Sequence, residues 1–198
     1  MTWDILDKSA LTSFIASVET TSEAPLFNPA YTEVKRLKLP FYQTLCLYRL
    51  TNFASMPLFT MHFIGDGSHF FYIDGTETPL IRAQEKGELI LSPKTIMAYL
   101  NFYFFAVVQS EGEVFVVRDT AAYPYQDALN VEETPAFSFG TPRPDIHPRG
   151  DGGFDVETPL FIDGTLMRTQ IQITTSGRVI IAPQKIIVTE GTTTHAPV

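Results

Sequence analysis

A four-residue motif, Ile-Asp-Gly-Thr, occurs twice in this chain, at residues 73–76 and 162–165. Each copy is followed, about a dozen residues later, by a second glycine, a short β-rich run and a proline, at residues 87–93 and 177–183. Asp and Gly tolerate the left-handed backbone conformations that tight hairpin turns require. The pattern therefore predicts two units in which neighbouring strands are joined by Asp-Gly turns.

The two copies admit two interpretations. The tetrapeptide Glu-Thr-Pro-Leu also occurs twice, but it follows the motif at residues 77–80 and precedes it at residues 157–160. A duplication would keep this order, whereas Asp-Gly turns arise often and independently. We favour two independent hairpins, with a true internal repeat of related β units as the alternative.

The composition favours β-structure with a large core. A chain of 198 residues that is 44% hydrophobic can bury a substantial core without metals or disulfides. Its 16 Phe and 8 Tyr side chains suit pleated sheets better than a helical bundle. The single cysteine, Cys46, cannot form an internal disulfide, and it lies in an apolar run. We expect Cys46 to be a core residue and not a nucleophile.

The charge balance excludes one class of partner. The net charge is −8, which opposes binding to the phosphates of a nucleic acid. The most apolar run, residues 99–108, is about half as long as a membrane span. The first residues lack the basic and apolar regions of a secretory signal. We therefore expect an acidic cytoplasmic protein with neither a nucleic-acid nor a membrane partner.

The first part of the chain predicts a helix followed by a meander. Apolar residues recur at helical spacing over residues 3–18, which indicates an N-terminal amphipathic helix. From residue 41 onward, short apolar runs bounded by Gly, Pro and Asp predict an antiparallel β-meander. The predicted strands are residues 43–50, 57–64, 69–73, 80–84 and 88–91.

A central helix is predicted next. Ser92 and Pro93 suit the start of a helix, and residues 96–109 are apolar nearly all round, as in a buried helix. The alternative is a strand at residues 99–108 that pairs with residues 114–118. We favour the helix, because the run is long for a strand.

The remainder of the chain divides at a segment rich in Pro and Gly. Residues 119–153 read as one long irregular loop, and three strands follow at residues 154–162, 165–174 and 178–188. The predicted fold is thus α+β and mainly antiparallel, with parts at residues 1–120, a connecting loop at 121–153, and a C-terminal meander at 154–198. This meander either packs with the first part as one domain or forms a small second β domain or barrel.

Two groups of residues are candidates for chemistry. His62, Asp66 and His69 surround a Gly-Asp-Gly turn, where two imidazoles and a carboxylate could converge on a metal. The irregular loop carries the candidate ligand-binding residues Arg143, Asp145, His147, Arg149 and Asp151. Arginine forks recognise carboxylates and phosphates, and Asp and His can hold a cation or move a proton. A turn Asp beside ordinary strand histidines, and a solvated charged loop, are the simpler interpretations.

The predicted function is a non-enzymatic binding or assembly module that forms a homodimer, because exposed strand edges and aromatic surfaces are usually covered by partners. A small-molecule ligand is the second kind of partner considered. The alternative is a hydrolase or another small-molecule enzyme, with a site formed by residues 143–155 and His62 or His69. No phosphate-binding loop, nucleophile elbow or zinc-protease motif is present, and no signature indicates a cofactor.

Overall fold

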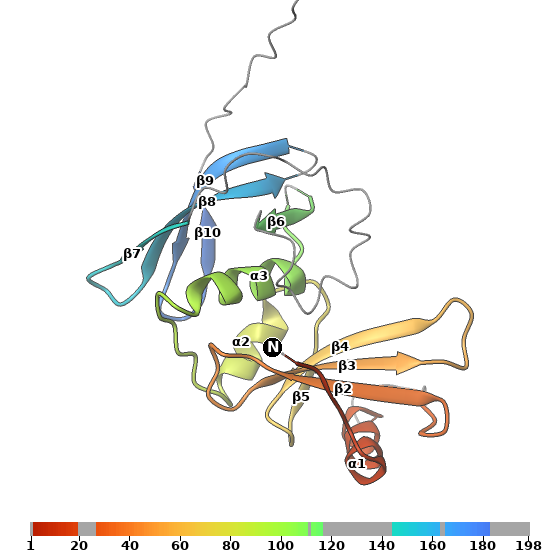
Figure 1. Ribbon diagram of the computed structural model, residues 1–198. Helices are drawn as coiled ribbons and strands as arrows, with labels where there is room; N and C mark the ends of the chain where they lie inside the picture. Colours follow the sequence, from red (N-terminus) through yellow and green to blue (C-terminus); the bar gives the residue numbers. More distant parts are fainter. Residues whose placement is uncertain (1, 20–26, 111, 117–143, 163–164, 183–198) are drawn as a thin grey trace, which may run out of the picture.

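The computed structural model describes residues 2–19, 27–110, 112–116, 144–162 and 165–182. Within these residues the chain forms three helices and two five-stranded antiparallel sheets (Figure 1). The predicted α+β class with mainly antiparallel strands is confirmed.

The first sheet is a meander whose strands follow one another in chain order. Its strands are β1 (Asp4–Ile5), β2 (Thr32–Lys38), β3 (Cys46–Asn52), β4 (Phe59–Gly65) and β5 (Phe70–Tyr72). The prediction is confirmed for β3, β4 and β5. Strand β2 was not predicted, because its four charged residues hide the alternation that buries Val34 on one face and Leu37 on the other.

Helix α1 (Lys8–Glu19) covers one face of this sheet. Phe14 is buried there, with its ring centroid 5.4 Å from that of Tyr48 and 5.6 Å from that of Phe63. The predicted helix is confirmed, but it begins later than expected. The side chain of Asp7 accepts a hydrogen bond of 2.9 Å from the backbone N–H of Ala10, and such a cap marks a helix start.

The first Ile-Asp-Gly-Thr copy is not a hairpin, so that prediction is wrong. Gly75 has the expected positive φ of 85°, but the chain then enters helix α2 (Thr78–Gln84) instead of a strand. Pro79 is tolerated because it lies in the first turn of the helix, and α2 buries Leu80 and Ala83. The strand predicted at residues 88–91 is reduced to a single bridge between Tyr42 and Leu89.

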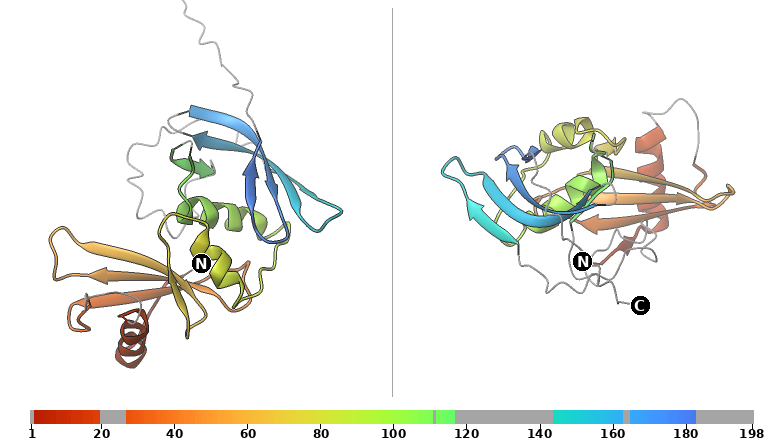
Figure 2. Two further views of the ribbon diagram at one scale, coloured as in Figure 1. Left: turned by 180° about the vertical axis from the view of Figure 1, so that it is seen from behind. Right: turned by 90° about the horizontal axis from the view of Figure 1, so that it is seen from above.

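Helix α3 (Ile96–Ala106) is the centre of the molecule, and it lies between the two sheets in Figures 1 and 2. Tyr99, Leu100 and Phe102 are completely buried. The core around α3 takes side chains from both sheets, for example Ile64 from the first and Val156 from the second. The predicted central helix is confirmed, and the alternative strand at residues 99–108 is wrong.

The second sheet is strongly curled (Figure 2). Its order is β10-β9-β8-β6, and β7 also pairs with β8. The strands are β6 (Val114–Val116), β7 (Asp145–Pro148), β8 (Phe154–Ile162), β9 (Thr165–Ile173) and β10 (Val179–Ile181). The pairing of β8 with β9 continues to Ile162 opposite Thr165, so the second motif copy does join two strands.

Part of the predicted irregular loop is regular. Residues 145–148 form β7, which pairs with β8, and the N–H of Arg149 donates to the carbonyl of Gly153 at 2.8 Å to close a turn. Residues 119–143 and 183–188 lie outside the described residues, and the division into domains stays a prediction. Among the residues that are described, no helix is both long and apolar enough to cross a bilayer.

Candidate functional site

The turn between β4 and β5 brings together two of the three candidate metal ligands. One oxygen of Asp66 accepts the backbone N–H groups of Ser68 and His69, at 2.8 and 2.7 Å, and the other lies 3.2 Å from His69 Nδ1. Partial burial acts to raise the pKa of Asp66, but these hydrogen bonds outweigh it and hold the pKa below its ordinary value. Asp66 therefore serves as the cap of a turn.

His62 lies apart from this pair. It is opposite Arg49 in the first sheet, and its ring packs edge-on against Phe105 at 4.9 Å. Asp66 follows four residues later, directly after the end of β4, which along an extended chain corresponds to roughly 13 Å. Among the described residues, no group of three His, Cys, Asp or Glu side chains is placed to hold a metal ion.

The position of His62 predicts a pH-dependent stability. Burial, and secondly the charge of Arg49, lower the pKa of His62 from 6.5 to about 4. As the pH falls below 6.5, His62 becomes protonated in the unfolded chain but stays neutral in the folded chain until about pH 4. The stability that is present at neutral pH is therefore lost progressively toward about pH 4. We expect His62→Phe to remove about 2 kcal/mol of the acid-induced loss in the free energy of unfolding, allowing for partial solvent screening. Urea unfolding at neutral pH and near pH 4 measures this difference.

His147→Phe is the matched control, because His147 is 67% exposed on β7. The acid-induced loss in the free energy of unfolding that we assign to the burial of His62 should remain in this variant. An equal pH dependence in the parent and the His62→Phe variant would contradict the predicted role of His62.

The described members of the second candidate group lie on the hairpin formed by β7 and β8. His147 Nε2 is 3.1 Å from Asp145 Oδ1, and Arg149 lies 3.0 Å from Asp151 and 3.9 Å from Asp155. Arg143 lies outside the described residues. The charges are thus paired with one another on an exposed hairpin, and β7 lies at the edge of the second sheet opposite to β10.

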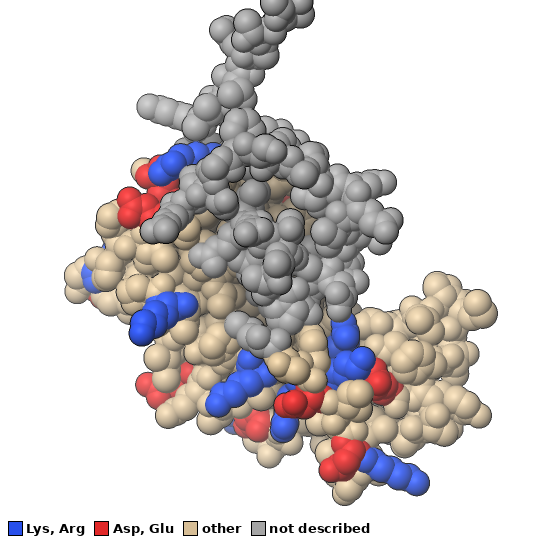
Figure 3. Space-filling view, viewed as in Figure 1, with Lys and Arg blue, Asp and Glu red and all other residues tan. Residues whose placement is uncertain are grey.

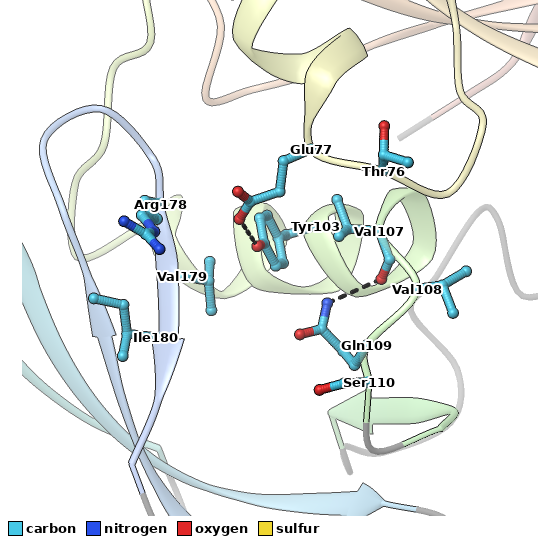
Figure 4. Close-up of a pocket in the computed structure, with 10 residues that line it drawn as sticks. All are labelled: Thr76, Glu77, Tyr103, Val107, Val108, Gln109, Ser110, Arg178, Val179 and Ile180. Carbon is cyan, nitrogen blue, oxygen red and sulfur yellow. Dashed lines mark hydrogen bonds between the residues drawn. The ribbon is translucent and has the colours of Figure 1, made fainter.

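A pocket of about 460 Å³ lies where β10, the end of α3 and the entry to α2 meet (Figure 4). Its volume is within the range of small-ligand sites. The lining residues combine an apolar wall with a few polar groups, and they are Thr76, Glu77, Tyr103, Val107, Val108, Gln109, Ser110, Arg178, Val179 and Ile180.

The polar groups of the pocket are arranged around Tyr103. Its hydroxyl donates a hydrogen bond to the carboxylate of Glu77, and Gln109 Nε2 donates to the carbonyl of Val107 at 3.0 Å (Figure 4). Burial and the Glu77 carboxylate raise the pKa of Tyr103, while Arg178 acts in the opposite direction. Tyr103 therefore keeps its proton at neutral pH and serves as a fixed donor, since a group that exchanges protons in catalysis needs a pKa near the working pH.

The sequence did not point to this pocket. Its polar residues form no recognisable motif and come from three segments that are distant in the chain. The local spacing of residues therefore does not predict the pocket. One signal was present: Glu77 directly follows the first motif, and Arg178 directly follows the glycine after the second motif.

A second candidate is an uncharged surface at the end of the β3–β4 hairpin, which we call the hairpin end. It exposes five large apolar side chains: Tyr31 (57% exposed), Phe53 (53%), Met56 (99%), Leu58 (60%) and Phe59 (42%). Residues 52–59 contain no charge, and Figure 3 shows this end as a continuous surface without Lys, Arg, Asp or Glu. Exposed apolar clusters of this kind mark interaction sites.

Comparison with known proteins gave no match to a protein-family model, a curated protein or a solved structure.

Proposed function

We propose that this protein is a non-enzymatic assembly module that forms a homodimer through the hairpin end. The observation that carries the proposal is the exposure of five large apolar side chains on one uncharged end. Burying apolar surface of this kind away from water stabilises a complex.

The charge of the chain favours a second copy on this surface. Each copy carries a net charge of −8, so two copies approach with least repulsion where neither presents a charge. Such a contact is self-complementary, as a two-fold dimer requires.

The edge of β4 can extend the contact. Strand β5 pairs only with Phe63–Gly65, and among the described residues no strand covers the outer edge of residues 59–61. Two such edges can pair antiparallel about a two-fold axis. The five side chains offer on the order of 500 Å² per copy. This is below the roughly 800 Å² of a standard interface, and the edge supplies part of the rest.

Met56→Asp is the test of this proposal. Met56 is 99% exposed, so the change should leave the fold intact while placing two like charges in the contact. We expect the dimer to weaken by at least about tenfold, measured by sedimentation velocity over a concentration series. Ile81→Asp is the matched control, because Ile81 is 56% exposed on α2 and should leave the dimer unchanged.

A parent protein that sediments as a monomer at every concentration would overturn the proposal. An equal weakening of the dimer by Ile81→Asp would also overturn it, because the effect would then come from added negative charge alone.

The enzymatic alternative uses residues that lie on different sheets. Asp145 and His147 belong to β7 in the second sheet, whereas His62 belongs to β4 in the first. This separation supports binding over catalysis as the function we propose.

We further infer a cytoplasmic location, which is supported by the single, free Cys46.

A further inference from the structure

Strand β10 lies at one edge of the second sheet, and its hydrogen bonds to β9 show which backbone groups point away from β9. The N–H of Thr174 donates to the carbonyl of Arg178 at 3.0 Å, and the N–H of Ala182 donates to the carbonyl of Gln170 at 2.9 Å. Along an antiparallel ladder, alternate residues bond to the same neighbour. Residues 178, 180 and 182 therefore face β9, and Val179 and Ile181 direct their N–H and C=O groups away from it.

This free edge opens onto the pocket. Val179 and Ile180 line one wall, and residues 107–110, which leave α3 in an extended conformation at Val107 and end in a turn, form the facing wall (Figure 4). The facing wall is anchored, because the N–H of Val108 donates to the carbonyl of Gly75 at 2.8 Å. Among the described residues, no strand pairs with the outer edge of β10. The pocket thus lies between one free strand edge and one fixed extended segment.

The free edge sets the kind of ligand. Val179 and Ile181 direct their N–H and C=O groups to this edge, and a row of such groups is a template for pairing with another strand. Groups on the same edge two residues apart are separated by roughly 7 Å, which matches the repeat of another extended chain. A peptide strand satisfies this repeat, whereas a compact small molecule does not.

The charges select a carboxylate at one end of the groove. Arg178 begins β10, its side chain is exposed, and within the described residues it makes no ion pair. The carboxylate of Glu77 accepts a hydrogen bond from the hydroxyl of Tyr103 and, among the described residues, makes no ion pair with Arg178 (Figure 4). A guanidinium group binds a carboxylate through two parallel hydrogen bonds.

We propose that the groove between β10 and residues 107–110 binds an extended peptide, which adds as a strand to β10 and places a carboxylate against Arg178. Main-chain pairing supplies the affinity in this mode, and side-chain pockets supply the selectivity. The volume of about 460 Å³ suits a strand of a few residues. This is a second binding site, separate from the hairpin end.

Amide hydrogen exchange in the free protein tests the first step. The amides of Val179 and Ile181 should exchange at least about tenfold faster than the amide of Ile180, which is bonded to β9. Equal protection of the three amides would overturn the proposal, because the edge would then be occupied by the chain itself.

Selection from a display library of random heptapeptides with free carboxyl ends tests the second step. We expect enriched peptides that carry an acidic residue or use the terminal carboxylate, and that protect the Val179 and Ile181 amides when bound. Arg178→Gln should weaken their binding about tenfold, and N-methylation of alternate peptide residues should abolish it. Amidation of the peptide terminus distinguishes a terminal carboxylate from an acidic side chain.

Arg82→Gln is the matched control, because Arg82 is an exposed arginine on α2 that does not line the pocket. It should leave peptide binding unchanged. A library that yields no peptide dependent on Arg178, or peptides that bind equally well to the Arg178→Gln and parent proteins, would overturn the proposal.

Discussion

Replacing Gly177 with alanine is expected to lower the free energy of unfolding by about 3 kcal/mol, as measured by urea denaturation. Gly177 occupies the turn between β9 and β10 with a φ of 78°, a conformation that costs an L-residue about 1 kcal/mol. An added Cβ would lie 2.7 Å from Leu89 Cδ2 and 3.0 Å from Gln84 Nε2, and it would also press on the hydroxyl of Tyr99. Tyr99 is completely buried, so its hydroxyl has little room to move.

The turn matters because it joins the second sheet to the helices. The hydroxyl of Tyr99 donates to the carbonyl of Gly177, and Gln84 Nε2 donates to the hydroxyl of Tyr42 at 3.1 Å. A buried carbonyl that loses its donor costs about 1–3 kcal/mol. Displacing the turn would therefore break a polar contact as well as a packing contact.

Gly150→Ala is the matched control for this prediction. No atom lies within 4 Å of the Cβ position at Gly150, and its φ is outside the left-handed region. The free energy of unfolding should change by less than about 0.5 kcal/mol. Equal losses in the two variants would show that the close fit of Gly177 against α2 and α3 does not add to the free energy of unfolding.

Phe102→Ala is expected to cost about 3–5 kcal/mol of the free energy of unfolding. Phe102 is completely buried in the centre of α3, with its ring centroid 5.4 Å from that of Phe41 and 6.5 Å from those of Tyr42 and Phe105. Truncation would leave a cavity between the two sheets, and the surrounding core is too closely packed to fill it.

Phe104→Ala provides the comparison within the same helix. Phe104 is only partly buried, and its ring lies 5.8 Å from that of Tyr103. We expect less than half of the loss caused by Phe102→Ala, measured under the same denaturant conditions. A similar loss in both variants would contradict the central position of Phe102.

Helix α3 connects the stability of the fold to the pocket. Tyr99 and Tyr103 are four residues apart, so they lie on the same helix face. Tyr99 contacts the turn before β10, and Tyr103 contacts Glu77 in the pocket. The same helix face therefore contacts both the turn that leads into β10 and the Glu77 side of the pocket, so we expect substitutions in the core to change the geometry of the pocket.

The local sequence was sufficient where one element carries its own signal. Residues 96–106 are apolar on nearly all sides, and such a run is long for a strand and typical of a buried helix. Residues 168–173 of β9 alternate strictly between exposed and buried residues, because one face of this strand meets the core. In contrast, residues 80–84 form a helix because Leu80 and Ala83 have a core to pack against, which short-range patterns do not reveal.

The candidate sites differ in how well the sequence predicted them, because some are built from neighbours in the chain and others from distant segments. Residue type and spacing drew attention to Asp66 with His69 and to the charged residues near Arg149, and these groups do lie close together because they are neighbours in the chain. The pocket takes Glu77, Tyr103 and Arg178 from segments separated by many residues.

The sequence by itself thus determined the α+β class, the central helix and most strands, because these follow from burial patterns within one short segment. Only the tertiary structure decided that the first motif copy enters a helix, that the free edge of β10 opens onto a pocket, and that the apolar residues near Met56 share one exposed end. These features depend on which distant segments meet, and their residue types alone do not encode that meeting.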